Sequence, residues 1–222
     1  MKRFKYILIL LFLAASITSC HKSSEVSNIF IGYDYFPLKQ GSWILYKVDS
    51  VFYSPFGTDS SSWLMKEVID SIYTDGQGVT NGIVKRYSTS AENPAWNIPP
   101  VVWNVSLSSI TAEKVEDNIR YVKLEFPIKN GLKWNGNYYN GEPEQVFTYK
   151  WINQGGIIGN FVFDSLLKVN QQDFSTLISK DFSEEVYAVG IGSVYIHKEH
   201  LSNLLASKTG YTYNAEIIDW SD

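Results

Sequence analysis

The sequence is poor in the residues that build covalent and metal-dependent sites. It has one cysteine and three histidines among 222 residues. A single cysteine excludes an intramolecular disulfide, and three histidines leave few ligands for a zinc site and few partners for a serine-type triad. The Gly-x-Ser-x-Gly motif of a nucleophile elbow does not occur either. We therefore expect a protein that is not an enzyme and that uses no cofactor and no metal.

Clusters of basic residues are also missing. The formal net charge is −4, and the only charged residues before position 21 are Lys2, Arg3 and Lys5, so the remainder of the chain is more acidic still. An acidic chain without a run of lysine or arginine lacks the charge that attracts polyphosphates. Nucleic acid is therefore not an expected partner.

The N-terminus has the parts of a secretory signal peptide. A basic start is followed by an unbroken apolar run of nine residues, from Ile7 to Ala15, and then by small residues. This run is too short to span a bilayer as a helix, which takes about 20 residues. The stretch Ile17-Thr18-Ser19-Cys20 resembles a bacterial lipobox, which implies cleavage before Cys20 and acylation of its thiol. The alternative is a plain signal peptide with an incidental cysteine.

The expected organisation has three parts. Residues 1–19 are the lipoprotein signal peptide, residues 20–32 are a lipid-anchored polar tether, and residues 33–222 form a single β-rich domain. One domain is sufficient because all-β domains often reach about 200–250 residues. We expect the acyl chains on Cys20 to anchor the protein to the outer membrane. Whether it faces the periplasm or the surface stays open.

The composition predicts β structure, because aromatic residues make up 15% of the whole sequence and favour strands. Alternating apolar residues predict strands at 43–53, 62–74, 121–128, 146–151, 161–169 and 211–217. Turn signals are expected to separate them at 75–78, 81–82, 130–131, 135–136, 140–141 and 154–156. Short turns join antiparallel strands, so we expect an all-β antiparallel meander that forms a curved sheet or incomplete barrel. At most short helices are expected, one of them at 200–207, with long loops at 54–62 and 91–100.

Two segments resemble a family of uncharacterised Bacteroidetes lipoproteins. The first, within residues 36–51, has the pattern Phe-Pro-Leu-x-x-Gly-x-Trp-x-x-Tyr. The second, Tyr187 to Tyr195, is similar to a Tyr-Ala-x-Gly-Val-Gly-x-Val-Tyr strand pair of that family. The resemblance covers about 30 positions. It implies a lipid-anchored β-rich domain and brings no known activity with it.

Several polar groups invite a catalytic or ligand-binding interpretation. Gly190 and Gly192 lack the third glycine and the helix of a nucleotide-binding loop, so a β-bulge or tight bend is expected there. On a helix, His197 and His200 would share a face and could hold a metal ion, whereas on a strand they would point to opposite faces. Adjacent glutamates such as Glu184 and Glu185 resemble an acid/base pair only in sequence, and solvated charges are the simpler interpretation.

Tryptophans are the residues of this sequence with the most potential to bind a ligand. Trp96, Trp103 and Trp134 lie in or beside segments rich in Pro, Gly and Asn. An exposed indole can stack on a sugar or line an apolar cleft, whereas a buried one completes the core. These residues are the speculative ligand-binding candidates.

Four functions remain open at this stage. The first is a non-catalytic cell-envelope lipoprotein that acts as a binding or scaffold module, with an envelope protein as a partner. The second is a carrier of a lipid or other apolar ligand, which requires a deep apolar cavity inside the sheet. The third is a glycan-binding surface module, and the fourth and weakest is an enzyme.

Overall fold

A computed structural model describes residues 30–90 and 95–221, and within them it forms one antiparallel β-sheet. The 12 strands are β1 (Trp43–Ser54), β2 (Gly57–Thr74), β3 (Thr80–Ser90), β4 (Val101–Leu107), β5 (Thr111–Glu116), β6 (Ile119–Glu125), β7 (Lys133–Asn135), β8 (Val146–Ile158), β9 (Phe161–Ser175), β10 (Ser179–Ala188), β11 (Gly192–Ser202) and β12 (Thr209–Trp220). A single 3-10 turn, η1 (Tyr33–Tyr35), precedes them. The all-β prediction is confirmed.

The sheet consists of two meanders joined through the first and last strands. Its order is β6-β5-β4-β3-β2-β1-β12-β11-β10-β9-β8-β7, so β1 pairs with β12 and all other neighbours are consecutive in the chain. The two outermost strands approach each other, because the Val122 amide donates to the Gly136 carbonyl at 2.9 Å and the Trp134 indole donates to the Val122 carbonyl at 2.9 Å. The sheet is therefore a nearly closed barrel.

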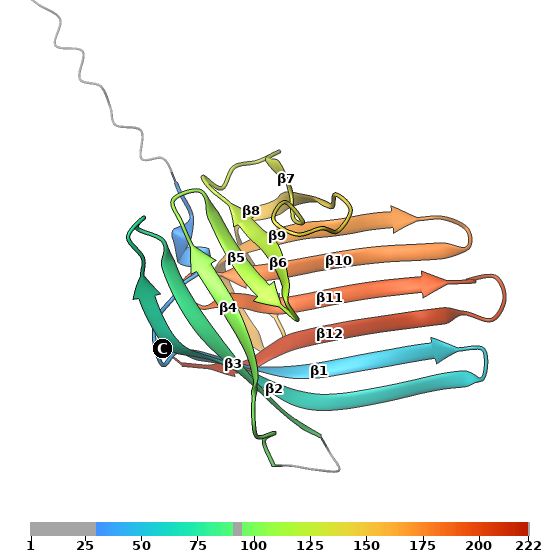
Figure 1. Cartoon of the computed structure of the whole chain (residues 1–222). Coiled ribbons are helices and arrows are strands. Elements are labelled where there is room, and N and C mark those ends of the chain that lie inside the picture. The colour runs from blue at the N-terminus through green and yellow to red at the C-terminus, as the bar shows by residue number, and fades with distance from the viewer. Residues whose placement is uncertain (1–29, 91–94, 222) are drawn as a thin grey trace, which may run out of the picture.

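Strand length gives the molecule two different ends (Figure 1). Long strands β8 to β12, β1 and β2 run side by side, while β3 to β6 fold over one end of them. The described chain begins at that end with η1, and Ser221 lies there too, since its amide donates to the Trp43 carbonyl at 2.9 Å. The β1–β2, β9–β10 and β11–β12 turns lie at the opposite end. We call these the entrance end and the distal end.

An aromatic core fills much of the barrel. Strand alternation turns one set of side chains inward, and the largest cluster of buried residues draws on strands from β3 to β10 and on η1. Its fully buried members include Tyr35, Tyr149 and Tyr187, each at 2% exposure or less. The Tyr149 hydroxyl donates to the Glu125 carbonyl at 2.7 Å, which ties β8 to β6 across the gap between the outer strands.

The structure corrects several local predictions. Residues 54–62 are not a long loop, because β1 and β2 continue to the tight turn at Pro55-Phe56, where Ser54 pairs with Gly57. The serine-rich start of β2 is extended because cross-strand pairing with β1 outweighs its weak strand propensity. The predicted turns at 81–82 and 154–156 lie inside β3 and β8, and the predicted helix at 200–207 is the end of β11 followed by a turn.

Glycine is required at the β11–β12 hairpin. Gly210 has a φ of +116°, and a Cβ added there would lie 1.9 Å from the His200 carbonyl oxygen. Only glycine adopts such a conformation readily. At the other end of β11, Gly190 and Gly192 have φ values of 77° and 104° in the turn after β10, which confirms the expected tight bend.

The N-terminal predictions fall mostly outside the described residues. The predicted signal peptide at 1–19, the predicted acylation site Cys20 and nearly all of the predicted tether at 20–32 precede Phe30. From Phe30 onward, leaving aside residues 91–94 and 222, no helix has the length and apolar character needed to cross a bilayer.

Candidate functional site

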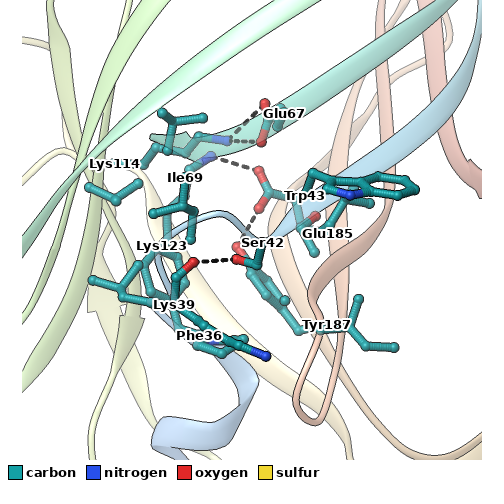
Figure 2. A pocket seen from close by; sticks show the side chains of 18 of the residues that line it. Phe36, Lys39, Ser42, Trp43, Glu67, Ile69, Lys114, Lys123, Glu185 and Tyr187 are labelled. Atoms are coloured by element: carbon teal, nitrogen blue, oxygen red, sulfur yellow. Dashed lines mark hydrogen bonds and ion pairs between the residues drawn. The ribbon is translucent and has the colours of Figure 1, made fainter. Parts of the chain in front are cut away.

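A cavity of about 160 Å³ opens at the entrance end of the barrel (Figure 2). We call it the entrance cavity. Its rim comes from the segment before β1, including Phe36 and Leu38, and from the β10–β11 turn at Gly190 and Ile191. Its base is polar and carries Glu67, Lys114, Glu116, Lys123 and Glu185. The cavity therefore has an apolar rim and a charged base.

Backbone hydrogen bonds hold the rim in place. The Gly41 amide donates to the Ile69 carbonyl at 2.7 Å, and the Ile69 amide donates to the Ser42 carbonyl at 2.9 Å, so β2 fixes the segment that leads into β1. On the other side, the Gly190 amide donates to the Asp34 carbonyl of η1 at 2.8 Å. The two halves of the rim are thus anchored to the sheet and to η1.

Glu67 is the first carboxylate of the base. It accepts from Lys114 Nζ at 2.9 Å and from Arg86 at 2.5 Å, and its side chain is 13% exposed. Burial alone would raise the pKa of Glu67, but the charges of Lys114 and Arg86 outweigh it and lower the pKa to about 2. Glu67 is therefore ionised at neutral pH.

Lys123 joins the other two carboxylates. Its Nζ lies 2.6 Å from Glu185 Oε1 and 3.2 Å from Glu116 Oε1, with 5% of its side chain exposed. Burial disfavours the ammonium, but Glu116 and Glu185 more than compensate and raise the pKa of Lys123. The Tyr187 hydroxyl also donates to Glu185, as Figure 2 shows. We call Glu67, Arg86, Lys114, Glu116, Lys123 and Glu185 the buried ion-pair network.

The network has balanced charge, with three cations and three carboxylates. Lys114 links its two halves, because Lys114 Nζ also lies 3.7 Å from Glu116 Oε1. Burial of so many charges is tolerated only when each has a partner. Each of these six groups has one.

Ser193 adds a hydroxyl without a partner to the cavity wall. Its carbonyl accepts from the Tyr46 hydroxyl at 2.7 Å. Its own Oγ is buried and has no hydrogen-bond partner among the described residues. A buried polar atom without a partner costs stability, so this hydroxyl can bond a group that enters the cavity.

The structure separates the three candidate tryptophans. Trp103 lies in β4 and Trp134 in β7, each 6% exposed, so of the two interpretations of these residues, completion of the core holds for both. The Arg86 guanidinium covers the Trp103 ring at 3.3 Å from its centroid. Trp134 packs against Tyr149 at 4.5 Å between ring centroids. Of the three candidates, Trp96 alone, at 38% exposure, presents its indole to solvent.

Other polar candidates do not come together. Both His197 and His200 lie in β11, where His197 hydrogen-bonds Asn214 and His200 pairs with Asp181. Across 30–90 and 95–221, no three His, Cys, Asp or Glu side chains are close enough to one another to hold a metal ion. Glu184 and Glu185 point to opposite faces of β10, where Glu184 binds Lys168 and Glu185 binds Lys123.

Sequence reasoning missed the buried ion-pair network. Its members come from β2, β3, β5, β6 and β10, so no short motif contains them. One signal was available, since Lys123 lies between Val122 and Leu124 in an apolar stretch. A charged residue in such a stretch indicates a buried partner elsewhere.

Comparison with known proteins gives limited similarity. No protein-family model matches the chain, and no curated protein matches it in sequence. Among solved structures, a protein described as exported, with a YmcC-like fold, from Bacteroides fragilis NCTC 9343 is 12% identical, with a TM-score of 0.45 over 84% of this chain and 98% of that one. A protein described as a lipoprotein from Parabacteroides distasonis ATCC 8503 is 10% identical, also with a TM-score of 0.45 and the same coverage. These values assign no family, so the resemblance to Bacteroidetes lipoproteins stays a prediction.

Proposed function

We propose that this protein is a non-catalytic lipoprotein of the cell envelope whose barrel binds a small amphipathic ligand in the entrance cavity. The observation that carries the binding role is the cavity itself, which has an apolar rim, a charged base and the unpartnered Ser193 hydroxyl. The envelope location rests on the signal peptide and on the lipobox at Cys20.

Cavity size limits the ligand. A volume of about 160 Å³ is close to the ~150 Å³ apolar cavity that accommodates a benzene ring. The space therefore fits a ring-sized group, and a whole membrane lipid is not the ligand that we propose. Phe36, Leu38 and Ile191 would contact the apolar part of such a ligand, while Ser193 would bond its polar atom.

The charges at the base support binding without catalysis. A general acid needs a carboxyl that stays protonated near neutral pH. Glu67, Glu116 and Glu185 instead all have a lowered pKa, because nearby lysines and arginine offset the effect of burial. Their role in this proposal is to shape and polarise the base of the cavity.

Ring-sized probes test the binding role. Phenol, indole and benzyl alcohol would be titrated into the protein and followed by ligand-observed NMR, with native mass spectrometry of the purified protein to detect a co-purified ligand. We expect saturable binding by the wild type and at least tenfold weaker binding by Ile191→Trp, which narrows the rim. Leu177→Trp is the matched control, because Leu177 is 82% exposed in the β9–β10 turn at the distal end. Equal binding by both variants, or no binding by any probe, would refute the proposal.

The lipid anchor has its own test. Cells grown with an alkyne-bearing palmitate analogue should label the wild-type protein, and the label should be absent from Cys20→Ser. Cys20 is the one cysteine of the chain, so the control is a serine substitution that leaves it intact, such as Ser23→Ala. Labelling of Cys20→Ser would show that the anchor lies elsewhere.

A further inference from the structure

A second cavity, of about 190 Å³, lies on the other side of the buried ion-pair network. We call it the distal cavity. It shares Glu116 and Lys123 with the entrance cavity but extends toward His200, eight positions along β11 from Gly192. Its lining is mostly polar and includes Gln171, Ser183 and Lys198. The network therefore separates two different chemical environments.

Lys198 brings into this cavity an ammonium without an ion-pair partner in the described chain. No carboxylate of the described residues lies within 4.0 Å of its ammonium. The carboxylates that line the cavity have other partners: Glu116 pairs with Lys123, Asp181 with His200, and Glu199 with Lys180 and His197. Lys198 is therefore the lysine of this cavity that lacks an ion-pair partner among the described residues. Burial lowers the pKa of Lys198, and repulsion from Lys123 lowers it further, while Glu116 and Glu185 oppose the shift. An anion placed beside Lys198 would give its ammonium the partner that it lacks.

Gln171 provides an independent second observation. Its side chain is 95% buried, since 5% of it is exposed, and it lines the same cavity. The Ser183 hydroxyl donates to Gln171 Oε1 at 2.8 Å. Gln171 Nε2, however, is buried without a hydrogen-bond partner anywhere in the described parts of the chain. An N–H donor that is desolvated and unpaired requires an acceptor.

Ser183 places these two groups next to each other. In the β10–β11 register, Ser183 stands directly opposite Lys198, and opposed residues have Cβ atoms about 5 Å apart. The same Ser183 is hydrogen-bonded to Gln171 from β9. A cation and a neutral donor thus flank one serine in a cavity large enough for a small solute.

We propose that the distal cavity binds an oxyanion, the carboxylate or phosphate group of a small solute, through the Lys198 ammonium and the Gln171 amide. Charge-assisted hydrogen bonds of this kind are short and strong. The site is separate from the entrance cavity and does not depend on the proposed function. Lys198 and Gln171 would bind the oxyanion, and the aromatic side chains of Tyr121 and Phe147 at the cavity wall would contact the rest of the solute.

Titration of the full protein with simple anions tests this inference. Sodium acetate and sodium phosphate are added at constant ionic strength, with chloride as the balancing salt, and the Gln171 side-chain amide signals are followed by NMR. We expect saturable shifts with at least one of the two anions, and the stronger binder distinguishes a carboxylate from a phosphate site. Shifts that are equal in chloride alone, or that never saturate, would overturn the proposal.

Variants separate a specific site from general salt effects. Lys198→Met should weaken anion binding at least tenfold, whereas Lys47→Met, which removes an exposed lysine of the outer surface, should leave it unchanged. Gln171→Glu offers a second arm that does not remove the lysine, because the new carboxylate would pair with Lys198. It should abolish anion binding and raise the melting temperature. Unchanged binding by Gln171→Glu, or equal binding by Lys198→Met and Lys47→Met, would refute the site.

The two proposals can fail independently. Ile191→Trp narrows the entrance cavity and should leave acetate or phosphate binding intact. Lys198→Met should likewise leave the binding of phenol intact. Loss of both ligands in either variant would show that the two cavities are one site and would overturn the inference of a separate oxyanion site.

Discussion

Lys123 of β6 and Glu185 of β10 form an ion pair inside the barrel, with 2.6 Å between Nζ and Oε1. Their side chains are 5% and 4% exposed. These strands are distant in the sheet order, so the pair connects two sides of the barrel that share no backbone hydrogen bonds. It also stands between the two cavities, because both side chains line the base of the entrance cavity and Lys123 lines the distal one.

Removing one member of this pair should destabilise the protein strongly. Lys123→Met leaves Glu185 and Glu116 buried without their main partner, and breaking a buried pair in this way costs about 3–5 kcal/mol. The free energy of unfolding, measured by urea denaturation, reports the loss. Lys47→Met is the control, because Lys47 and Asp49 form a surface pair with side chains 56% and 50% exposed. Such a pair contributes about 0–1 kcal/mol, so a similar loss in both variants would contradict the structure.

Glu67 predicts a specific loss of stability in acid. Its pKa is about 2 in the folded protein against an ordinary value of 4.5, so its ionised form stabilises the fold above pH 4.5. This stabilisation, on the order of 3 kcal/mol, disappears as the pH falls from 4.5 toward 2. The difference in unfolding free energy between wild type and Glu67→Gln should therefore shrink between pH 7 and pH 3.

An exposed glutamate serves as the reference for this pH dependence. Glu142 lies on the surface, so Glu142→Gln should have a stability close to wild type at both pH values. If the difference between wild type and Glu67→Gln is the same at pH 7 and pH 3, the contacts of Glu67 with Lys114 and Arg86 do not form in solution.

Gly210→Ala should destabilise the β11–β12 hairpin. The new Cβ would lie 1.9 Å from the His200 carbonyl oxygen, at a φ of +116°. A loss of more than about 1 kcal/mol is expected, since alanine is incompatible with this backbone conformation. Gly76→Ala is the matched control, because a Cβ there meets nothing within 4 Å. Thermal unfolding would compare the two, and equal melting temperatures would contradict the hairpin geometry.

The tryptophans predict a contrast in stability. Trp134→Phe removes the hydrogen bond to the Val122 carbonyl and leaves space beside Tyr149, so a loss of about 1–3 kcal/mol is expected. Trp96→Phe changes an indole that is 38% exposed and should cost little. Urea denaturation distinguishes the variants. A larger loss of unfolding free energy in Trp96→Phe than in Trp134→Phe would contradict the burial of Trp134 in the core.

The sequence predicted the fold class because alternation depends on neighbouring residues. Tyr46 and Val48 both point inward from β1 because side chains two positions apart lie on the same face of a strand. Local errors arose where pairing with another strand decided the structure. Ser60, Ser61 and Ser62 are extended because β1 lies beside them, and Gly155 lies in β8 because β9 pairs with that strand.

The cavities could not be predicted from the sequence. Glu67, Lys114 and Glu185 are far apart in the chain, and each is surrounded by residues that look like an ordinary strand. Their meeting depends on barrel curvature, which follows from the twist of many strands together. The unpaired amide nitrogen of Gln171 could not be predicted either. Nothing in the local sequence shows that Ser183 hydrogen-bonds the side-chain oxygen of Gln171 and leaves its nitrogen without a partner in the described chain.

The hydrogen bond from the Gly190 amide to the Asp34 carbonyl has a mechanical consequence. It connects η1, where the described chain begins, to the rim of the entrance cavity. The Ile31 carbonyl, nearer to Phe30, accepts from the Ile128 amide at 3.0 Å. Tension applied through Phe30 would therefore load both the segment after β6 and the β10–β11 turn at the rim of the entrance cavity, while the turns at the far end of the long strands remain unloaded.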